Sequence, residues 1–170
     1  MNIVLIGYRG TGKSTVAQIL AQRTGRKVVS TDERIVETAG MNIPEIVKKY
    51  GWDRFRDIES EVVAEVSHRD GIIIDAGGGV IIRNQNIQLL RASGIVFWLT
   101  ANIDTIAKRI ESDDQRPSLT EKKSFIEEIH EVLEARTPLY RAAAHHVIET
   151  DNKTPLEVAE QILSSFRNYR

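Results

Sequence analysis

Residues 2–14 read NIVLIGYRGTGKS, and this stretch decides the fold. The apolar run at its start is typical of a strand that is buried on both faces of a parallel sheet. Residues 7–14 fit the pattern G-x-x-x-x-G-K-[ST], and apolar residues such as Val16 and Leu20 then recur at helical spacing, which predicts a helix over Lys13–Thr24. A strand, a glycine-rich loop and a helix in this order are the context that a phosphate-binding loop requires, and a chance glycine-rich turn is the alternative.

The loop has the chemistry of a nucleotide site. Its glycines let the backbone turn tightly, so that main-chain N–H groups and the positive end of the helix dipole face phosphate oxygens. Lys13 is a point cation suited to the β- and γ-phosphates, and Ser14 offers a hydroxyl ligand to a magnesium ion that also binds phosphate. We therefore expect a nucleoside triphosphate with Mg²⁺, held by Gly10, Thr11, Gly12, Lys13, Ser14 and Thr15.

Composition narrows the class of partner. The chain has 170 residues, a formal net charge of −1 and no cysteine, so we expect neither a nucleic-acid surface nor a disulfide or thiolate site. No apolar run is long enough to cross a bilayer, and the N-terminus lacks a signal-peptide pattern. These features favour a cytoplasmic protein that binds small molecules, and no large apolar stripe calls for a partner, so we expect a monomer.

Strand patterns alternate with helical patterns along the whole chain. We predict strands near residues 2–6, 27–29, 72–76, 95–99 and 145–149. This alternation predicts a three-layer α/β fold, with helices on both faces of a mostly parallel sheet of about five strands. No linker or internal repeat is present, so we expect residues 1–170 to form one domain.

Two helix boundaries are predicted from capping chemistry. Thr31 or Asp32 has a side chain suited to capping the helix that follows the second strand. A later helix, which starts near Ser124, should end at Arg136–Pro138, because proline disfavours helical geometry in the residue before it.

Ligands of parallel α/β sheets bind at the carboxyl ends of the strands. That rule predicts one cleft lined by three segments, Gly7–Ser14, Ser30–Asp32 and Asp75–Gly79. Asp75 either supports the magnesium site or caps its strand. The three glycines at residues 77–79 either bring main-chain N–H groups close to a ligand or form a tight turn.

Three side chains suggest a second, anionic substrate. Asp32 can hydrogen-bond an acceptor hydroxyl and take its proton, unless it is only a helix cap. Arg56 and Arg136 can each grip a carboxylate with two parallel hydrogen bonds. Each is otherwise a surface arginine, and Arg56 has acidic neighbours at i−3 and i+3 for a helix ion pair.

A charged segment without apolar periodicity at about 111–123 predicts a mobile lid. Arg109 precedes this segment, and Arg116 lies within it, directly before Pro117, which stiffens one edge of the lid. Such a lid can bring a cation onto the phosphates of the nucleotide.

The chain resembles the shikimate kinase family over essentially its whole length. The phosphate-binding loop alone is shared by many kinases. The combination of Thr31-Asp32, the segment FRDIE at 55–59, the triple glycine, Arg116-Pro117 and the segment RTPLY at 136–140 is much more specific.

The resemblance implies a role for each matching residue. Asp32 is similar to the base that orients the acceptor, Arg56 and Arg136 to the pair that grips the shikimate carboxylate, and Gly78 to a main-chain contact of shikimate. The acceptor region then spans about 32–61. On the nucleotide side, Arg116 is similar to a lid arginine that reaches ATP, Arg109 to an arginine near adenine, and Lys153 to a nucleotide contact that varies within the family.

One position departs from the family pattern, because Ser30 stands where the family usually has an acid associated with magnesium. The resemblance implies transfer of the ATP γ-phosphate to the 3-hydroxyl of shikimate. The alternatives are another small-metabolite kinase of the same fold, such as a gluconate or nucleoside monophosphate kinase, and an ATP-binding regulatory module without activity.

Overall fold

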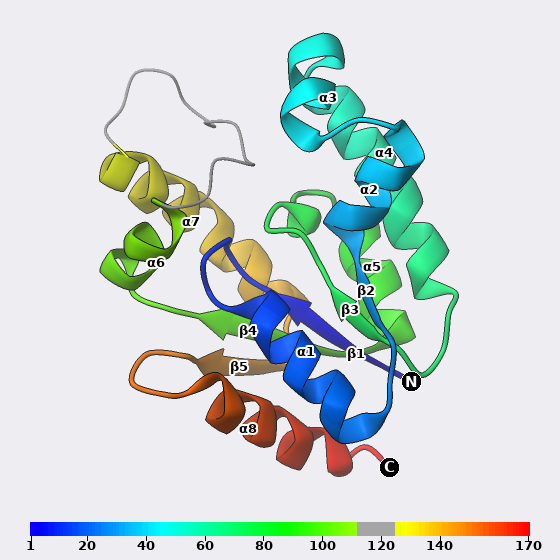
Figure 1. Ribbon diagram of the computed structural model, residues 1–170, viewed down its shortest axis with the longest axis vertical. Helices are drawn as coiled ribbons and strands as arrows, with labels where there is room; N and C mark the ends of the chain where they lie inside the picture. The colour runs from blue at the N-terminus through cyan, green and yellow to red at the C-terminus, as the bar shows by residue number, and fades with distance from the viewer. Residues whose placement is uncertain (112–124) are drawn as a thin grey trace.

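Five parallel strands form one sheet in the computed structural model, which describes residues 1–111 and 125–170. Their spatial order is β2-β3-β1-β4-β5, so the strand that precedes the phosphate-binding loop is central (Figure 1). The strands are β1 (Asn2–Ile6), β2 (Val28–Ser30), β3 (Ile73–Asp75), β4 (Gly94–Thr100) and β5 (His146–Glu149). The predicted three-layer α/β fold with a parallel five-stranded sheet is confirmed.

Helices cover both faces of the sheet. The helices α1 and α8 pack on one face and on each other, whereas α4, α5 and α7 pack on the opposite face, with α2 and α3 against α4 (Figure 1). The helices of the described part are α1 (Lys13–Thr24), α2 (Thr31–Ala39), α3 (Ile43–Tyr50), α4 (Trp52–Ser67), α5 (Asn84–Ser93), α6 (Ile103–Ile110), α7 (Phe125–Ala143) and α8 (Pro155–Arg167), with a short 3-10 helix at Val80–Ile82.

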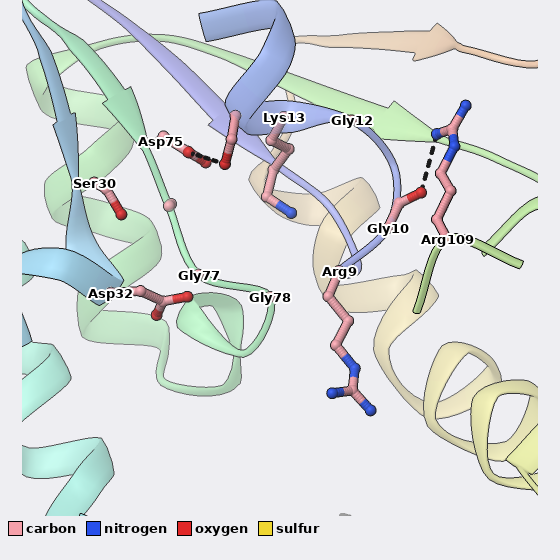
Figure 2. A pocket seen from close by; sticks show the side chains of 12 residues that line it. Arg9, Gly10, Gly12, Lys13, Ser30, Asp32, Asp75, Gly77, Gly78 and Arg109 are labelled. Carbon is pink, nitrogen blue, oxygen red and sulfur yellow. Dashed lines mark hydrogen bonds between the residues drawn. The ribbon is translucent and has the colours of Figure 1, made fainter. Parts of the chain in front are cut away.

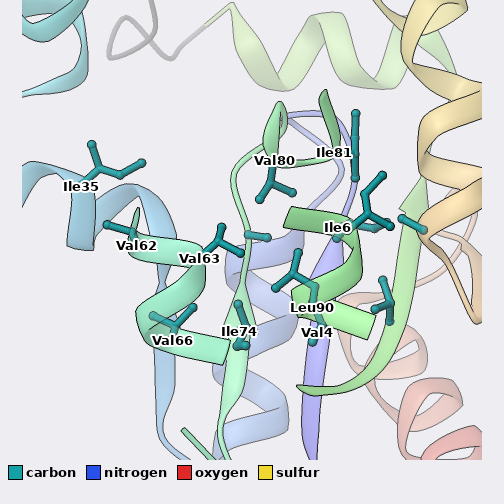
Figure 3. Close-up of a cluster of buried hydrophobic side chains, with 14 of the residues drawn as sticks. Val4, Ile6, Ile35, Val62, Val63, Val66, Ile74, Val80, Ile81 and Leu90 are labelled. Atoms are coloured by element: carbon teal, nitrogen blue, oxygen red, sulfur yellow. The ribbon is translucent and has the colours of Figure 1, made fainter. Parts of the chain in front are cut away.

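The central strand β1 is apolar from Ile3 to Ile6 because both of its faces are buried. Side chains alternate along a strand, so Ile3 and Leu5 point into the core under α1 and α8. Val4 and Ile6 point the other way, into the core beneath α4 and α5 (Figure 3). This double burial makes β1 a rigid base for the loop that follows it.

The cap of α2 differs from the prediction. Neither Thr31 nor Asp32 caps this helix, because the Ser30 hydroxyl accepts a hydrogen bond from the Glu33 N–H at 3.2 Å. Asp32 therefore lies inside the first helical turn, one residue after Thr31. Its carboxylate is therefore not the cap of α2.

The predicted end of α7 at Arg136–Pro138 is wrong, because the helix continues to Ala143. Pro138 removes one main-chain hydrogen bond. The second half of the helix is retained because Tyr140 and Ala143 are buried in the core beneath it. Arg91 also donates to the Ala143 carbonyl at 3.0 Å, which satisfies one carbonyl at the helix end. Packing therefore outweighs the local preference of proline.

No helix of the described ranges is both long and apolar enough to cross a membrane.

His145 joins the end of α7 to β4. Its ring nitrogen Nδ1 accepts a hydrogen bond from the Val96 main-chain N–H at 3.0 Å, and the main-chain N–H of His145 donates to the Val96 carbonyl at 2.8 Å. Burial lowers the pKa of His145 below its ordinary value of 6.5, and the neighbouring charges of Arg91 and His146 lower it further. The folded protein therefore favours the neutral ring, which can accept this hydrogen bond.

We predict that the free energy of unfolding decreases as the pH falls from about 7.5 to about 5.5, because the unfolded chain takes up a proton at His145 before the folded chain does. His145→Phe should lower stability at the higher pH and flatten this dependence. Urea unfolding at a series of pH values measures it. His130→Phe, at an exposed position on α7, is the control, and an unchanged slope in His145→Phe would contradict the assignment.

Candidate active site

A cavity of about 290 Å³ lies at the carboxyl ends of β1, β2 and β3 (Figure 2). The three segments predicted to line one cleft do so, and one residue from α6 joins them. The lining consists of Arg9, Gly10, Gly12, Lys13, Ser14, Ser30, Asp32, Asp75, Ala76, Gly77, Gly78 and Arg109.

The conformation of the loop at residues 7–14 depends on glycines with positive φ angles and on hydrogen bonds within the loop. Gly10 and Gly12 have φ angles of 82° and 90°, which side-chain-bearing residues rarely adopt. The Lys13 ammonium donates to the carbonyls of Gly7 at 2.8 Å and Tyr8 at 3.2 Å, and this side chain is only 8% exposed. The Lys13 cation is thus fixed within the loop whose main-chain N–H groups would bind phosphate.

A hydroxyl and a carboxylate meet beside the loop. The Ser14 hydroxyl donates to Asp75 Oδ2 at 2.7 Å, and Ser30 is paired with Asp75 in the register of β2 and β3. Mg²⁺ takes oxygen ligands of these kinds, and it is usually bound by one or two carboxylates together with phosphate oxygens and water. Ser30 stands where the family usually has an acid, and its hydroxyl caps α2. The cavity-lining carboxylate that Ser14 contacts is Asp75.

Asp32 faces the turn that follows β3. A Cβ atom added to Gly77 would lie 2.5 Å from Asp32 Oδ1, so glycine is needed for this approach. The Gly77 N–H donates to the Thr31 hydroxyl at 2.9 Å, which fixes the turn against the start of α2. The alternative that Asp32 is only a helix cap is wrong, since Ser30 is the cap.

Arg56 is buried beside the same turn. Its guanidinium forms an ion pair of 2.8 Å with Glu59, whose side chain is 1% exposed. The guanidinium also lies over the ring of Phe55, with Cζ 4.9 Å from the ring centroid. A Cβ atom on Gly79 would lie 2.6 Å from Arg56 Cζ, so the third glycine provides the space that the guanidinium occupies.

Arg136 reaches the middle glycine from α7. A Cβ atom on Gly78 would be 3.8 Å from one terminal nitrogen of Arg136, and Arg136 Cζ lies 5.9 Å from the centroid of the Tyr8 ring. One helical turn later, the Tyr140 hydroxyl donates to the Gly78 carbonyl. The continuation of α7 past Pro138 therefore positions both residues at the turn.

The remaining predicted nucleotide contacts are distributed unevenly. Arg109 donates to the Gly10 carbonyl at 3.0 Å, beside the loop. Thr11 is buried and donates to the Tyr8 carbonyl at 2.8 Å, whereas Thr15 is exposed on α1. Lys153 is bound to Gln161 of α8 at 3.0 Å and does not line the cavity. Arg116, and the predicted lid apart from Glu111, lie outside the described residues.

Several contributors to the site were not predicted. Tyr140 follows Arg136 at i+4, a spacing that places both on one helical face, but only if α7 is extended through Pro138. Capping chemistry predicts Thr31 as a helix cap and not as a partner of the Gly77 N–H. The i+3 spacing predicts Glu59 as an ion-pair partner of Arg56 but not its burial. Arg9 lies at a variable position of the loop motif, so the motif carries no signal for it.

A phosphate-binding loop opposite a carboxylate and two arginines, on a parallel α/β sheet, defines a nucleotide-dependent phosphotransferase that acts on a small molecule. The family model described as shikimate kinase matches residues 9–167. The chain therefore belongs to the shikimate kinase family.

Individual relatives agree with this assignment. A shikimate kinase of Dehalococcoides mccartyi is 39% identical, over 99% of this chain and 94% of the relative. One of Thermodesulfovibrio yellowstonii is 40% identical, over 97% of this chain and 94% of the relative. The solved structure of shikimate kinase from Acinetobacter baumannii in complex with shikimate superposes with a TM-score of 0.94 at 33% identity, covering 99% of this chain and 94% of that one.

We predict that Tyr140→Phe destabilises the protein by about 1–3 kcal/mol, because the buried Gly78 carbonyl loses this donor. Urea unfolding followed by circular dichroism measures the change. Tyr50→Phe removes a hydroxyl from a side chain that is 53% exposed, and it should change stability by less than about 0.5 kcal/mol. Equal effects in the two variants would contradict the role of Tyr140.

Proposed function

We propose that this protein transfers the γ-phosphate of ATP to the 3-hydroxyl of shikimate, giving ADP and shikimate 3-phosphate. The observation that carries the proposal is the approach of Asp32, Arg56 and Arg136 to the triple-glycine turn. Two glycines of that turn and Asp32 line the same cavity as Lys13. Membership of the shikimate kinase family supports the choice of acceptor.

On the donor side, the loop holds the triphosphate. Main-chain N–H groups and the N-terminus of α1 bind phosphate oxygens, and the Lys13 ammonium exchanges its carbonyl partners for the β- and γ-phosphates. Phosphoryl transfer passes through a loose transition state, so positioning and charge stabilisation supply most of the rate enhancement.

The Ser14 hydroxyl and the Asp75 carboxylate are the groups that would support a magnesium ion at the phosphates. The ion would neutralise charge on the β- and γ-phosphates. Asp75 also fixes the rotamer of Ser14 through the hydrogen bond that joins them.

On the acceptor side, Arg56 and Arg136 grip the carboxylate and Asp32 receives the hydroxyl. The hydroxyl oxygen forms a bond to the γ-phosphorus as the bond from that phosphorus to the ADP oxygen breaks, and the hydroxyl proton passes to the Asp32 carboxylate. The Glu59 carboxylate keeps the Arg56 guanidinium in the orientation that meets the ligand.

The direct test is an assay of ADP release with ATP, Mg²⁺ and shikimate, in which each component is omitted in turn. Gluconate and AMP are supplied in parallel as alternative acceptors, because kinases of this fold also act on such molecules. Release that depends on shikimate supports the proposal. Release with gluconate or AMP alone would identify another small-metabolite kinase, and ATP binding without release would indicate a regulatory module.

We predict that Asp32→Asn abolishes turnover and leaves ATP affinity nearly unchanged, because the amide cannot accept the proton and the loop is untouched. The ADP-release assay and calorimetric titration with ATP measure the two quantities. Glu33→Gln removes the same charge from the same helical turn at an exposed position, and it should retain activity. Turnover by Asp32→Asn close to that of the wild type would disprove its role as base.

We predict that Arg136→Ala weakens shikimate binding by about 2–5 kcal/mol, as expected when one partner of a charged pair is truncated. Calorimetric titration with shikimate measures the loss. Arg141→Ala, at an exposed site on the same helix, should bind as the wild type does. An unchanged shikimate affinity in Arg136→Ala would remove this arginine from the acceptor site.

A further inference from the structure

Arg9 is a cation of the cavity that the proposed function does not yet use. It occupies a variable position of the loop motif and lines the cavity with Lys13, Asp32 and Gly78 (Figure 2). Its side chain is partly buried. Within residues 1–111 and 125–170, no hydrogen bond or ion pair engages the Arg9 guanidinium.

The other cations near this cavity are already engaged by protein groups. Lys13 is bound to carbonyls of the loop, and Arg109 donates to the Gly10 carbonyl. The charge of Arg56 is balanced by the buried Glu59 carboxylate. An arginine that is partly removed from water without an anion is unfavourable, and a bound anion relieves that cost.

The position of Arg9 indicates which ligand it meets. Figure 2 shows the Arg9 side chain leaving the loop near Gly78 and extending away from the Lys13 ammonium. A Cβ atom on Gly78 would lie 3.4 Å from the Arg9 main-chain nitrogen and 3.8 Å from the terminal nitrogen of Arg136. The Arg9 main chain and the Arg136 guanidinium therefore both lie next to Gly78, and Arg9 and Gly78 line the same cavity.

We propose that Arg9 is a third acceptor-binding arginine, which contacts the acceptor carboxylate together with Arg136 and makes the site selective for anionic acceptors. Because Glu59 balances the charge of Arg56, Arg9 and Arg136 supply the positive charge that compensates the carboxylate. The inference rests on the proposed function, since it names a further determinant of the same acceptor site.

The test is Arg9→Met, which keeps the length and the main chain of the loop but removes the charge. Calorimetry with shikimate in the absence of nucleotide should show an affinity loss of about tenfold or more, as for other truncated charge pairs. The KM for ATP should change by less than about twofold, since Arg9 points away from the donor phosphates. Arg167→Met, at an exposed site on α8, is the matched control.

A second ligand separates charge recognition from a structural effect. The methyl ester of shikimate has no negative charge, so wild type and Arg9→Met should bind the ester with nearly equal affinity. An equal loss for the acid and the ester would overturn the inference, as would a loss confined to ATP. Arg9→Lys should recover part of the affinity for the acid.

The outcomes also separate this inference from the proposed function. If the wild type releases ADP with shikimate but Arg9→Met binds shikimate as tightly as the wild type does, only the inference on Arg9 fails. If the wild type shows no shikimate-dependent release and no binding of shikimate, the proposed function fails and the inference fails with it.

Discussion

The acceptor half of the site depends on the absence of side chains at Gly77 and Gly79. A Cβ atom on Gly77 would collide with the Asp32 carboxylate, and one on Gly79 would collide with the Arg56 guanidinium. Gly79 has an ordinary φ of −99°, so glycine is required there by close approach and not by backbone geometry. The turn thus accommodates a carboxylate from α2 and a guanidinium from α4 beside the phosphate-binding loop.

Two helices support this turn. Thr31 binds the Gly77 N–H from α2, and Tyr140 donates to the Gly78 carbonyl from α7. The Tyr140 ring is itself stacked on Trp98 of β4, with ring centroids 5.6 Å apart. Because these partners are buried, the turn is held in one conformation before any ligand binds, which reduces the entropy lost on binding.

Much of this arrangement could be predicted from the sequence. Doubly buried strands and helical periodicity predicted the layers, and the rule for carboxyl ends of strands predicted the cleft. Local rules failed where tertiary packing prevails. Pro138 predicted a helix end that the burial of Tyr140 overrides, and the cap of α2 moved to Ser30. The contact of Arg56 with Gly79 depends on the approach of distant segments, which periodicity does not report.

The space left by Gly79 allows Arg56 to hold the acceptor in the proposed function. Gly79→Ala tests this role most directly, with calorimetric measurement of shikimate and ATP binding to the same folded variant. We expect the methyl group to displace the Arg56 guanidinium, so that shikimate affinity falls at least about tenfold while ATP affinity is retained. Shikimate binding equal to that of the wild type, in a variant with unchanged stability, would contradict the account.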